Sequence, residues 1–188
     1  MRNFILLLAV LLIAGCAAPA LEKSEAEIQS AGVSSTEDLS RLSIKDLSLL
    51  SGYALTEKNE PWDIIKAEVD YAFSQTFVKV GVGLPKDAPS VIVLDARTYK
   101  TLQTAEEKYS KPHEEETELG TRTEKNKEDV VISGKNAKLS LIRPDTGSYA
   151  VEILFIDRQT VIMVLVADFT AYKDALATEI AEAVAQKI

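Results

Sequence analysis

The sequence predicts an α+β fold, in which an antiparallel sheet in the C-terminal half is covered on one face by helices, including a C-terminal helix. Two aliphatic runs, residues 149–156 and 161–169, are separated by four polar residues and form the strongest hairpin signal in the chain. An apolar stripe follows them, with Leu176 and Ile180 four residues apart, as on one face of a helix. Consecutive strands followed by a closing helix are typical of a sheet that carries a helix on its surface.

Helical patterns and strands alternate in the N-terminal half. Residues 36–50 carry leucines at roughly helical spacing and end at a Ser-Gly pair, which favours a helix. Pro61 fits the first turn of a short helix that contains Trp62 and Val69. Residues 77–82 alternate, which predicts a strand with one apolar face made by three valines, Val78, Val80 and Val82.

The middle of the chain predicts a second strand, a helix and a polar segment. Residues 91–94 form the strand, and residues 97–109 form the helix, with Leu102 and Ala105 facing inward. Residues 110–129 are the longest polar stretch, typical of a solvated loop or an extended hairpin tip.

Short strands and a capped helix complete the C-terminal half. Residues 130–133 and 137–142 are expected to be strands, and Thr170 fits the N-cap of the final helix. The apolar stripe of that helix is expected to comprise Tyr172, Leu176, Ile180, Ala183 and Val184.

The N-terminus carries an export signal. A basic start is followed by an apolar run at residues 4–14, which is too short for a bilayer span of about 20 residues and fits a signal peptide. The run ends in Ile13-Ala14-Gly15-Cys16, which resembles the lipobox of bacterial lipoproteins. The alternatives are an ordinary signal peptide with a chance cysteine, and a retained helical anchor.

The resemblance implies cleavage between Gly15 and Cys16 by signal peptidase II, and acylation of Cys16. Ala17, where Asp would retain such a protein in the inner membrane, implies the outer membrane, facing the periplasm. Two or three acyl chains anchor stably, because each buried methylene contributes about 0.8 kcal/mol. We therefore expect a signal peptide at residues 1–15, a lipidated tether at 16–40 and one α+β domain at 41–188.

Composition excludes several functional classes. The net charge of −8 argues against nucleic acid as a partner, because phosphates require a basic surface. A single Cys and a single His exclude an internal disulfide and His-pair or multi-Cys metal sites. We expect no cofactor and no metal.

No catalytic residue is predicted. His113 stands beside three glutamates, but consecutive side chains point in different directions, so a solvated charged loop is favoured over a cation site. Trp62 is interpreted as a core residue rather than a ligand anchor. Paired carboxylates also occur, but carboxylates are too abundant to assign a pair without geometry; examples are Asp63 with Glu68 and Glu152 with Asp157.

Three functional hypotheses remain. The first is a non-enzymatic envelope lipoprotein, held to the membrane through the lipid on Cys16, whose domain binds an envelope protein partner or serves envelope assembly. The second is a carrier of a lipid or small apolar ligand in a pocket between sheet and helix, and the third is a hydrolase without a recognisable motif. The element order resembles the layout of the PsbP/Mog1-like sandwich found in some lipoproteins, a likeness of layout alone.

Overall fold

The structure, a computed structural model, divides into Met1–Gly32 and Val33–Ile188. It describes residue 33 and residues 35–59, 67–80, 84–110, 122–144 and 147–188, with the side chains of 122–127 and 144 left out. Everything below concerns these residues.

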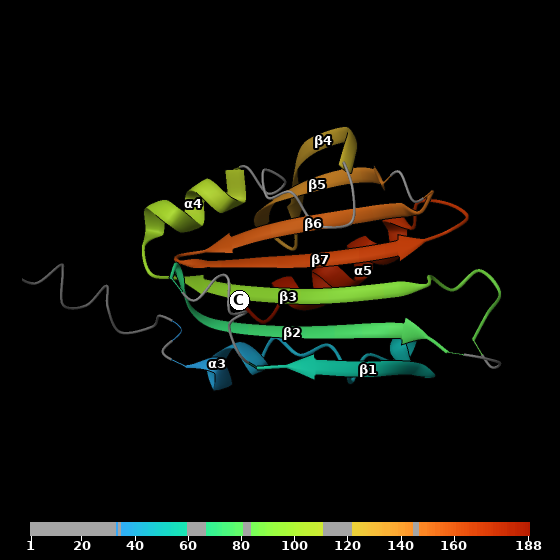
Figure 1. Ribbon diagram of the computed structural model, residues 1–188, viewed down its shortest axis with the longest axis horizontal. Helices are drawn as coiled ribbons and strands as arrows, with labels where there is room; N and C mark the ends of the chain where they lie inside the picture. The colour runs from blue at the N-terminus through green and yellow to red at the C-terminus, as the bar shows by residue number, and fades with distance from the viewer. Residues whose placement is uncertain (1–32, 34, 60–66, 81–83, 111–121, 145–146) are drawn as a thin grey trace, which may run out of the picture. The chain divides into compact units, whose positions relative to one another are not determined.

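A seven-stranded, fully antiparallel sheet runs through the described chain in the order β1-β2-β3-β7-β6-β5-β4. Figure 1 shows the strands side by side, with α5 behind them. The strands are β1 (Tyr53–Lys58), β2 (Val69–Lys79), β3 (Val91–Tyr99), β4 (Arg122–Ile132), β5 (Lys135–Pro144), β6 (Tyr149–Asp157) and β7 (Thr160–Asp168). The expected antiparallel sheet with a C-terminal helix is therefore present, but it extends beyond the C-terminal half.

The pairing of β3 with β7 joins the two halves of the chain. Val91 lies opposite Ala167, and Thr98 lies opposite Thr160 at the other end of the ladder. The hydroxyls of Thr98 and Thr160 are 2.9 Å apart and hydrogen-bonded. This ladder places β1–β3 and the C-terminal strands in one continuous sheet.

Strand β2 corrects two expectations. It begins at Val69, which was assigned to a helix, and its buried face is not the valine face. Phe73 and Phe77 are 0% and 2% exposed, whereas Val78 and Val80 are 38% and 55% exposed. The aromatic side chains remove more apolar area from water than the valines do, and this decides which face of the strand packs inward.

The helix after β3 also differs from its expected limits. Residues up to Tyr99 remain in the sheet, and α4 spans Leu102–Ser110. The hydroxyl of Thr101 accepts a hydrogen bond of 3.1 Å from the N–H of Thr104, which starts the helix. Ala105 is fully buried as expected, but Leu102 is 48% exposed and does not face inward.

The polar segment forms more strand than expected. Residues 122–129 belong to β4, which pairs with β5 in a hairpin, so the hairpin alternative describes them better than the loop. Ser133 and Gly134 have φ of 49° and 80°, as a tight hairpin turn requires. A polar segment can form this strand because β4 lies at an edge of the sheet.

The C-terminal hairpin and helix are confirmed. Strands β6 and β7 pair from Tyr149↔Asp168 to Asp157↔Thr160, and α5 spans Asp174–Ala185. Thr170 is not the N-cap, because its hydroxyl donates to the Asp168 carboxylate and the helix begins four residues later. The buried stripe contains Ile180 and Val184 as expected, together with three alanines, Ala177, Ala181 and Ala185.

The N-terminal segment enters the core earlier than expected. A short helix α3 (Thr36–Ser40) and a 3₁₀ turn η1 (Ser48–Leu50) replace the expected helix over residues 36–50. Leu39 and Ile44 are 1% and 0% exposed, so the core begins before residue 41. The Gln75 side chain accepts a 2.9 Å hydrogen bond from the N–H of Ile44, which holds this backbone against β2 in place of a helical bond.

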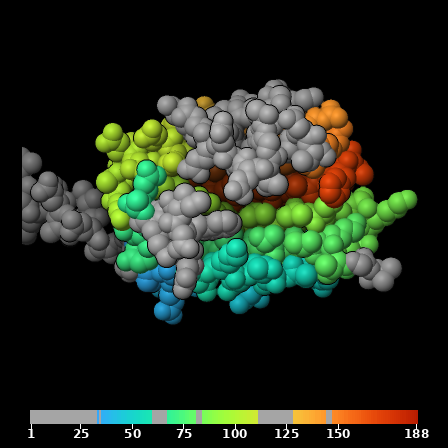
Figure 2. All heavy atoms as spheres, in the orientation of Figure 1, coloured from blue at the N-terminus to red at the C-terminus, as the bar shows by residue number. Residues whose placement is uncertain are grey.

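The sheet has two different faces. We call the core face the one on which α3, η1 and α5 pack, with Phe73, Phe155 and Ile180 in one apolar cluster. We call the other the open face. There, α4 packs through Ala105 against a smaller cluster that includes Tyr99 and Leu154, so helices lie on both faces of the sheet and not on one face as expected. Figure 2 shows α4 in yellow-green at one end of the molecule.

Candidate functional site

A cleft of about 480 Å³ lies beside α4 on the open face. Figure 1 shows α4 next to the ends of β6 and β7 where their turn lies. The cleft is lined by two groups of side chains, one from α4 and one from the end of β6 and its turn: Leu102, Glu106, Tyr109 and Ser110, and Ile156 and Arg158. We call it the α4 cleft.

Helical periodicity explains the α4 wall. Leu102, Glu106 and Tyr109 are spaced by four and three residues, so they share one face of the helix. Ala105 points to the sheet and is fully buried against the strands. A small residue at that position lets the helix lie close to the sheet, which leaves the neighbouring face of α4 as the wall of the cleft.

The cleft carries one charge of each sign. Glu106 and Arg158 are both exposed, and neither takes part in the salt bridges found among the described residues. By contrast, Lys108 on another face of α4 is 3.5 Å from the Glu68 carboxylate. Glu106 and Arg158 are therefore available to solvent or to a ligand.

Tyr109 contributes an aromatic wall. The ammonium of Lys138 lies 4.8 Å from the centre of its ring. Burial raises the pKa of the Tyr109 hydroxyl, and the nearby Asp129 charge adds to the rise. This hydroxyl therefore stays protonated at neutral pH and can act as a hydrogen-bond donor.

Arg158 has an unusual backbone. Its φ is 53°, a left-handed conformation that glycine or asparagine ordinarily occupies in such turns. The turn is also held from outside, because the carbonyl of Gln159 accepts a 2.8 Å hydrogen bond from the N–H of Tyr99. An arginine here costs backbone strain, and positions that keep such strain cluster at functional sites.

Several buried polar side chains also lie on the open face. Asp95 is 8% exposed, and its carboxylate is 2.7 Å from the Arg97 guanidinium. Burial raises the pKa of Asp95, while the charge of Arg97 opposes the rise. Glu152 is 1% exposed, but it lies opposite Leu165 on β7, whereas Asp95 lies opposite Met163. A full strand therefore separates the two carboxylates, and they do not form a catalytic pair.

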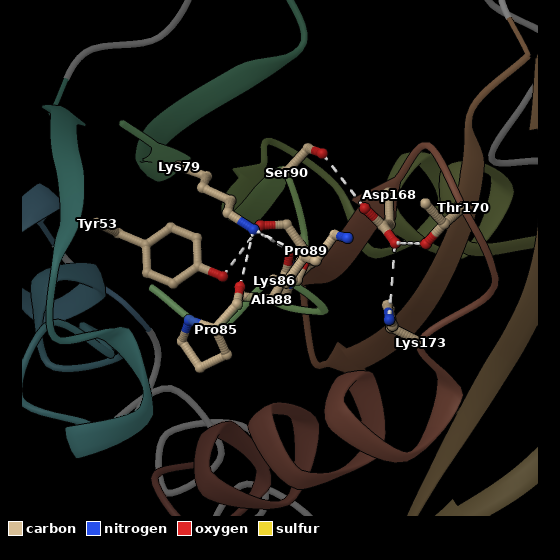
Figure 3. A network of polar contacts seen from close by, with 10 residues as sticks. All are labelled: Tyr53, Lys79, Pro85, Lys86, Ala88, Pro89, Ser90, Asp168, Thr170 and Lys173. Carbon is tan, nitrogen blue, oxygen red and sulfur yellow. Dashed lines mark hydrogen bonds and ion pairs between the residues drawn. The ribbon is translucent and has the colours of Figure 1, made fainter. Parts of the chain in front are cut away.

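A polar network closes one end of the sheet (Figure 3). The Lys79 ammonium donates to the carbonyls of Pro85, Lys86 and Ala88 at 2.9, 3.3 and 3.1 Å, and so ties down the connection that follows β2. The hydroxyl of Tyr53 donates to the carbonyl of Pro89 at 3.0 Å. These donors are satisfied by backbone acceptors, so we interpret this part of the network as a structural clamp.

Asp168 anchors the other part of this network. Its carboxylate accepts hydrogen bonds from Ser90 at 3.3 Å and Thr170 at 2.5 Å, and lies 3.6 Å from the Lys173 ammonium. Burial alone would raise the pKa of Asp168. The Thr170 hydroxyl, the N–H groups of Phe169 and Thr170, and the Lys173 charge outweigh that effect and lower it. The group joins β3, β7 and the start of α5.

Most of the residues singled out from the sequence are not among those that the structure describes. Gly15, Cys16, Trp62, Asp63 and His113 lie outside the described residues.

The carboxylate pairs are not brought together. Glu152 and Asp157 differ in parity along β6 and so point to opposite faces, with Glu152 buried and Asp157 exposed. Glu68 pairs with Lys108 instead. Among the described residues, no group of three metal-ligating side chains occurs.

The sequence reasoning missed the α4 cleft. Its two walls are about 50 residues apart in the chain, and only the pairing of β3 with β7 brings them together. The spacing of Leu102, Glu106 and Tyr109 was the available local signal, but it is equally typical of an ordinary surface helix. No helix among the described residues is long and apolar enough to cross a membrane.

Comparisons with known proteins identify a shared fold. No family model and no curated protein sequence matches the chain. Among solved structures, the extracellular domain of PknH from Mycobacterium tuberculosis matches with a TM-score of 0.51 and 9% identity, covering 81% of this chain and 96% of that one. At this identity the match is one of fold, so the chain shares its sheet-and-helix architecture with the extracellular domain of a mycobacterial protein.

Proposed function

We propose that this chain is an envelope lipoprotein, anchored by acyl chains on Cys16, that presents a non-enzymatic binding domain. The lipobox at Ile13-Ala14-Gly15-Cys16 is the observation that carries the proposal. The fold shared with an extracellular domain is compatible with export. Ala17 after the lipidated residue supports a place in the outer membrane, facing the periplasm.

Membrane attachment is tested by fractionating cells that express Cys16→Ala. We expect the variant to lose its membrane association, because loss of the thiol removes the site of acylation and each buried methylene contributes about 0.8 kcal/mol to anchoring. Ala18→Ser is the matched control and should still sediment with membranes. A Cys16→Ala protein that remains in the membrane pellet after a high-salt wash contradicts the anchor.

The assignment to the outer membrane is tested with the variant Ala17→Asp. The sorting rule implied by the lipobox resemblance predicts that this variant moves to the inner-membrane fraction in a Gram-negative host. If the variant and the wild type have the same distribution between membrane fractions in a sucrose gradient, the outer-membrane assignment is contradicted. This result does not contradict the lipid anchor.

A binding role is supported by the two faces of the sheet. On the core face, Phe155, Val164 and Ile180 are fully buried in one cluster, so this side of the domain serves folding. The α4 cleft on the open face instead presents exposed side chains of both charges beside apolar ones. A ligand that binds there can form ion pairs that Glu106 and Arg158 do not form with the other described residues.

One observation supports the hypothesis that the domain carries a lipid or small apolar ligand. The α4 cleft lies between a helix and the sheet, as a carrier would require, but beside α4 rather than α5. Glu106 and Arg158 in its lining disfavour a purely apolar ligand, because a lipid tail would leave both charges desolvated. We therefore favour a small polar or amphipathic ligand.

The hydrolase hypothesis has less support. Asp95 is a buried carboxylate with a raised pKa, a combination that active sites use. However, it lies against Arg97 and does not line the described cleft. Burial of this carboxylate on the sheet accounts for the raised pKa without a reaction, and the neighbouring Arg97 charge opposes the rise.

A further inference from the structure

The α4 cleft combines three features that together specify a ligand. Its volume of about 480 Å³ is within the range of roughly 300–1,000 Å³ typical of small-molecule sites. It presents a cation from the turn after β6 and an anion from α4, so opposite charges come from different walls. Leu102 and Ile156 add an apolar surface, with Leu102 48% exposed.

Neither ionic group of the cleft forms a salt bridge with another described residue. Within the described residues, the Arg158 guanidinium has no carboxylate within 4 Å and Glu106 has no cation within that distance. A planar guanidinium binds a carboxylate through two parallel hydrogen bonds. A carboxylate such as Glu106 accepts from an ammonium group.

The backbone of Arg158 is an independent observation. Its φ of 53° places an arginine where glycine is favoured. Arg158 also lines the cleft, and among the described residues neither an ion pair nor burial of its side chain offsets the strain. A binding role for the guanidinium accounts for an arginine at this position.

We propose that the α4 cleft binds a small zwitterionic ligand of the amino-acid or short-peptide class. The ligand carboxylate pairs with Arg158, its ammonium group pairs with Glu106, and an apolar side chain contacts Leu102 and Ile156. Tyr109 adds its ring and a hydroxyl donor. This inference rests on the proposed binding role and is independent of the lipid anchor on Cys16.

The test is isothermal titration calorimetry with the full chain in detergent micelles and the dipeptide leucyl-leucine as probe. Two analogues each remove one charge: the N-acetyl dipeptide lacks the ammonium group and the dipeptide amide lacks the carboxylate. We expect each analogue to bind roughly tenfold or more weakly than the dipeptide, the usual effect of losing a charge-assisted hydrogen bond.

Variants then assign each charge to its partner. Arg158→Gln should remove the preference for the dipeptide over its amide while keeping the preference over the N-acetyl form. Glu106→Gln should do the reverse. Glu107→Gln, the adjacent exposed residue of α4, and Arg143→Gln, an exposed arginine at the end of β5, are matched controls and should retain both preferences.

The inference is overturned by no measurable binding of the dipeptide at about 10 mM, by equal affinity for all three probes, or by charge preferences that survive in both cleft variants. Weaker binding of the amide alone also overturns it, because the site would then recognise an anion rather than a zwitterion. Fractionation of cells that express Cys16→Ala tests the lipid anchor, whereas the titrations test the α4 cleft. Failure of the anchor and failure of the ligand site are therefore distinguishable.

Discussion

At the scale of single residues, Asp168 illustrates how one carboxylate joins several elements. Its pKa is lowered in the folded state relative to the ordinary value of 3.8. The ionised group therefore stabilises the fold above about pH 4, and this contribution is lost as the pH falls through the lowered pKa. The pH dependence of the free energy of unfolding arises from the hydroxyl groups that donate to the Asp168 carboxylate and from the nearby Lys173 ammonium.

We predict that Asp168→Asn destabilises the protein most at neutral pH. The expected loss is about 1–2 kcal/mol, because hydrogen bonds to a charged acceptor are replaced by weaker ones. Urea unfolding at pH 7 and pH 3 measures it, and the difference from wild type should shrink at pH 3. The exposed Asp157→Asn control should stay within about 0.5 kcal/mol at both pH values. A pH-independent loss for Asp168→Asn contradicts the charge-based explanation.

The backbone conformation of Arg158 lowers the stability of the fold, whereas its side chain lines the cleft. We predict that Arg158→Gly raises the free energy of unfolding by about 0.5–1 kcal/mol, because glycine adopts a φ of 53° without the steric cost. The same change at Gln159, whose φ is negative, should destabilise the protein, since it only adds freedom to the unfolded chain. Thermal unfolding of both variants measures the pair, and a loss of stability in Arg158→Gly would show that the turn is unstrained.

At the scale of elements, α5 shows how local periodicity translates into packing. The stripe that faces the sheet is centred on Ile180, which is fully buried, while Leu176 is only partly buried at its margin. Ala177 and Ala181 are fully buried as well, because small side chains let the helix approach the strands closely. Ile180 therefore buries more of its side chain against the sheet than Leu176 does.

We predict that Ile180→Ala costs about 2–5 kcal/mol through lost burial and a residual cavity. Leu176→Ala should cost about 1–2 kcal/mol, because part of its side chain already contacts water. Urea denaturation of the two variants gives the comparison. Equal losses would mean that the helix packs through a broader face than its burial pattern indicates.

At the scale of the whole molecule, the N-terminal segment is part of the fold. Gln75 is fully buried and donates to the Ser43 hydroxyl at 2.7 Å and the Glu57 carboxylate at 2.8 Å, besides accepting from the N–H of Ile44. Leu39 and Ile44 complete the core around this contact. The segment before β1 is therefore held by both hydrogen bonds and apolar burial.

We predict that a chain beginning at Val33 folds cooperatively, whereas one beginning at Leu47 does not. The shorter chain loses Leu39, Leu42 and Ile44, and each fully buried aliphatic side chain contributes about 1.5–3 kcal/mol. Against a typical total stability of about 5–15 kcal/mol, this loss is decisive. Circular dichroism with thermal melting distinguishes the two chains, and a cooperative transition in the shorter one would place the core entirely within the sheet and α5.

The predictable part of the fold was encoded locally. The hairpin of β6 and β7 and the helix α5 follow from alternation, a polar turn and helical spacing within adjacent stretches. Both were predicted correctly, although the helix begins at Asp174 rather than after Thr170. The limits of β2 and α4 were not, because burial of Phe73 and pairing of Tyr99 depend on partners far away in the chain.

The sequence by itself determined the local elements of the C-terminal half and the prediction of a lipidated Cys16, since each depends on neighbouring residues alone. Only the tertiary structure decided that one sheet unites both halves, that the phenylalanine face of β2 is the buried one, and that Arg158 and Glu106 line one cleft. These features result from antiparallel pairing between β3 and β7, whose residues are about 70 positions apart. The closure of such a long loop is specified by the combined burial of many side chains rather than by any short pattern.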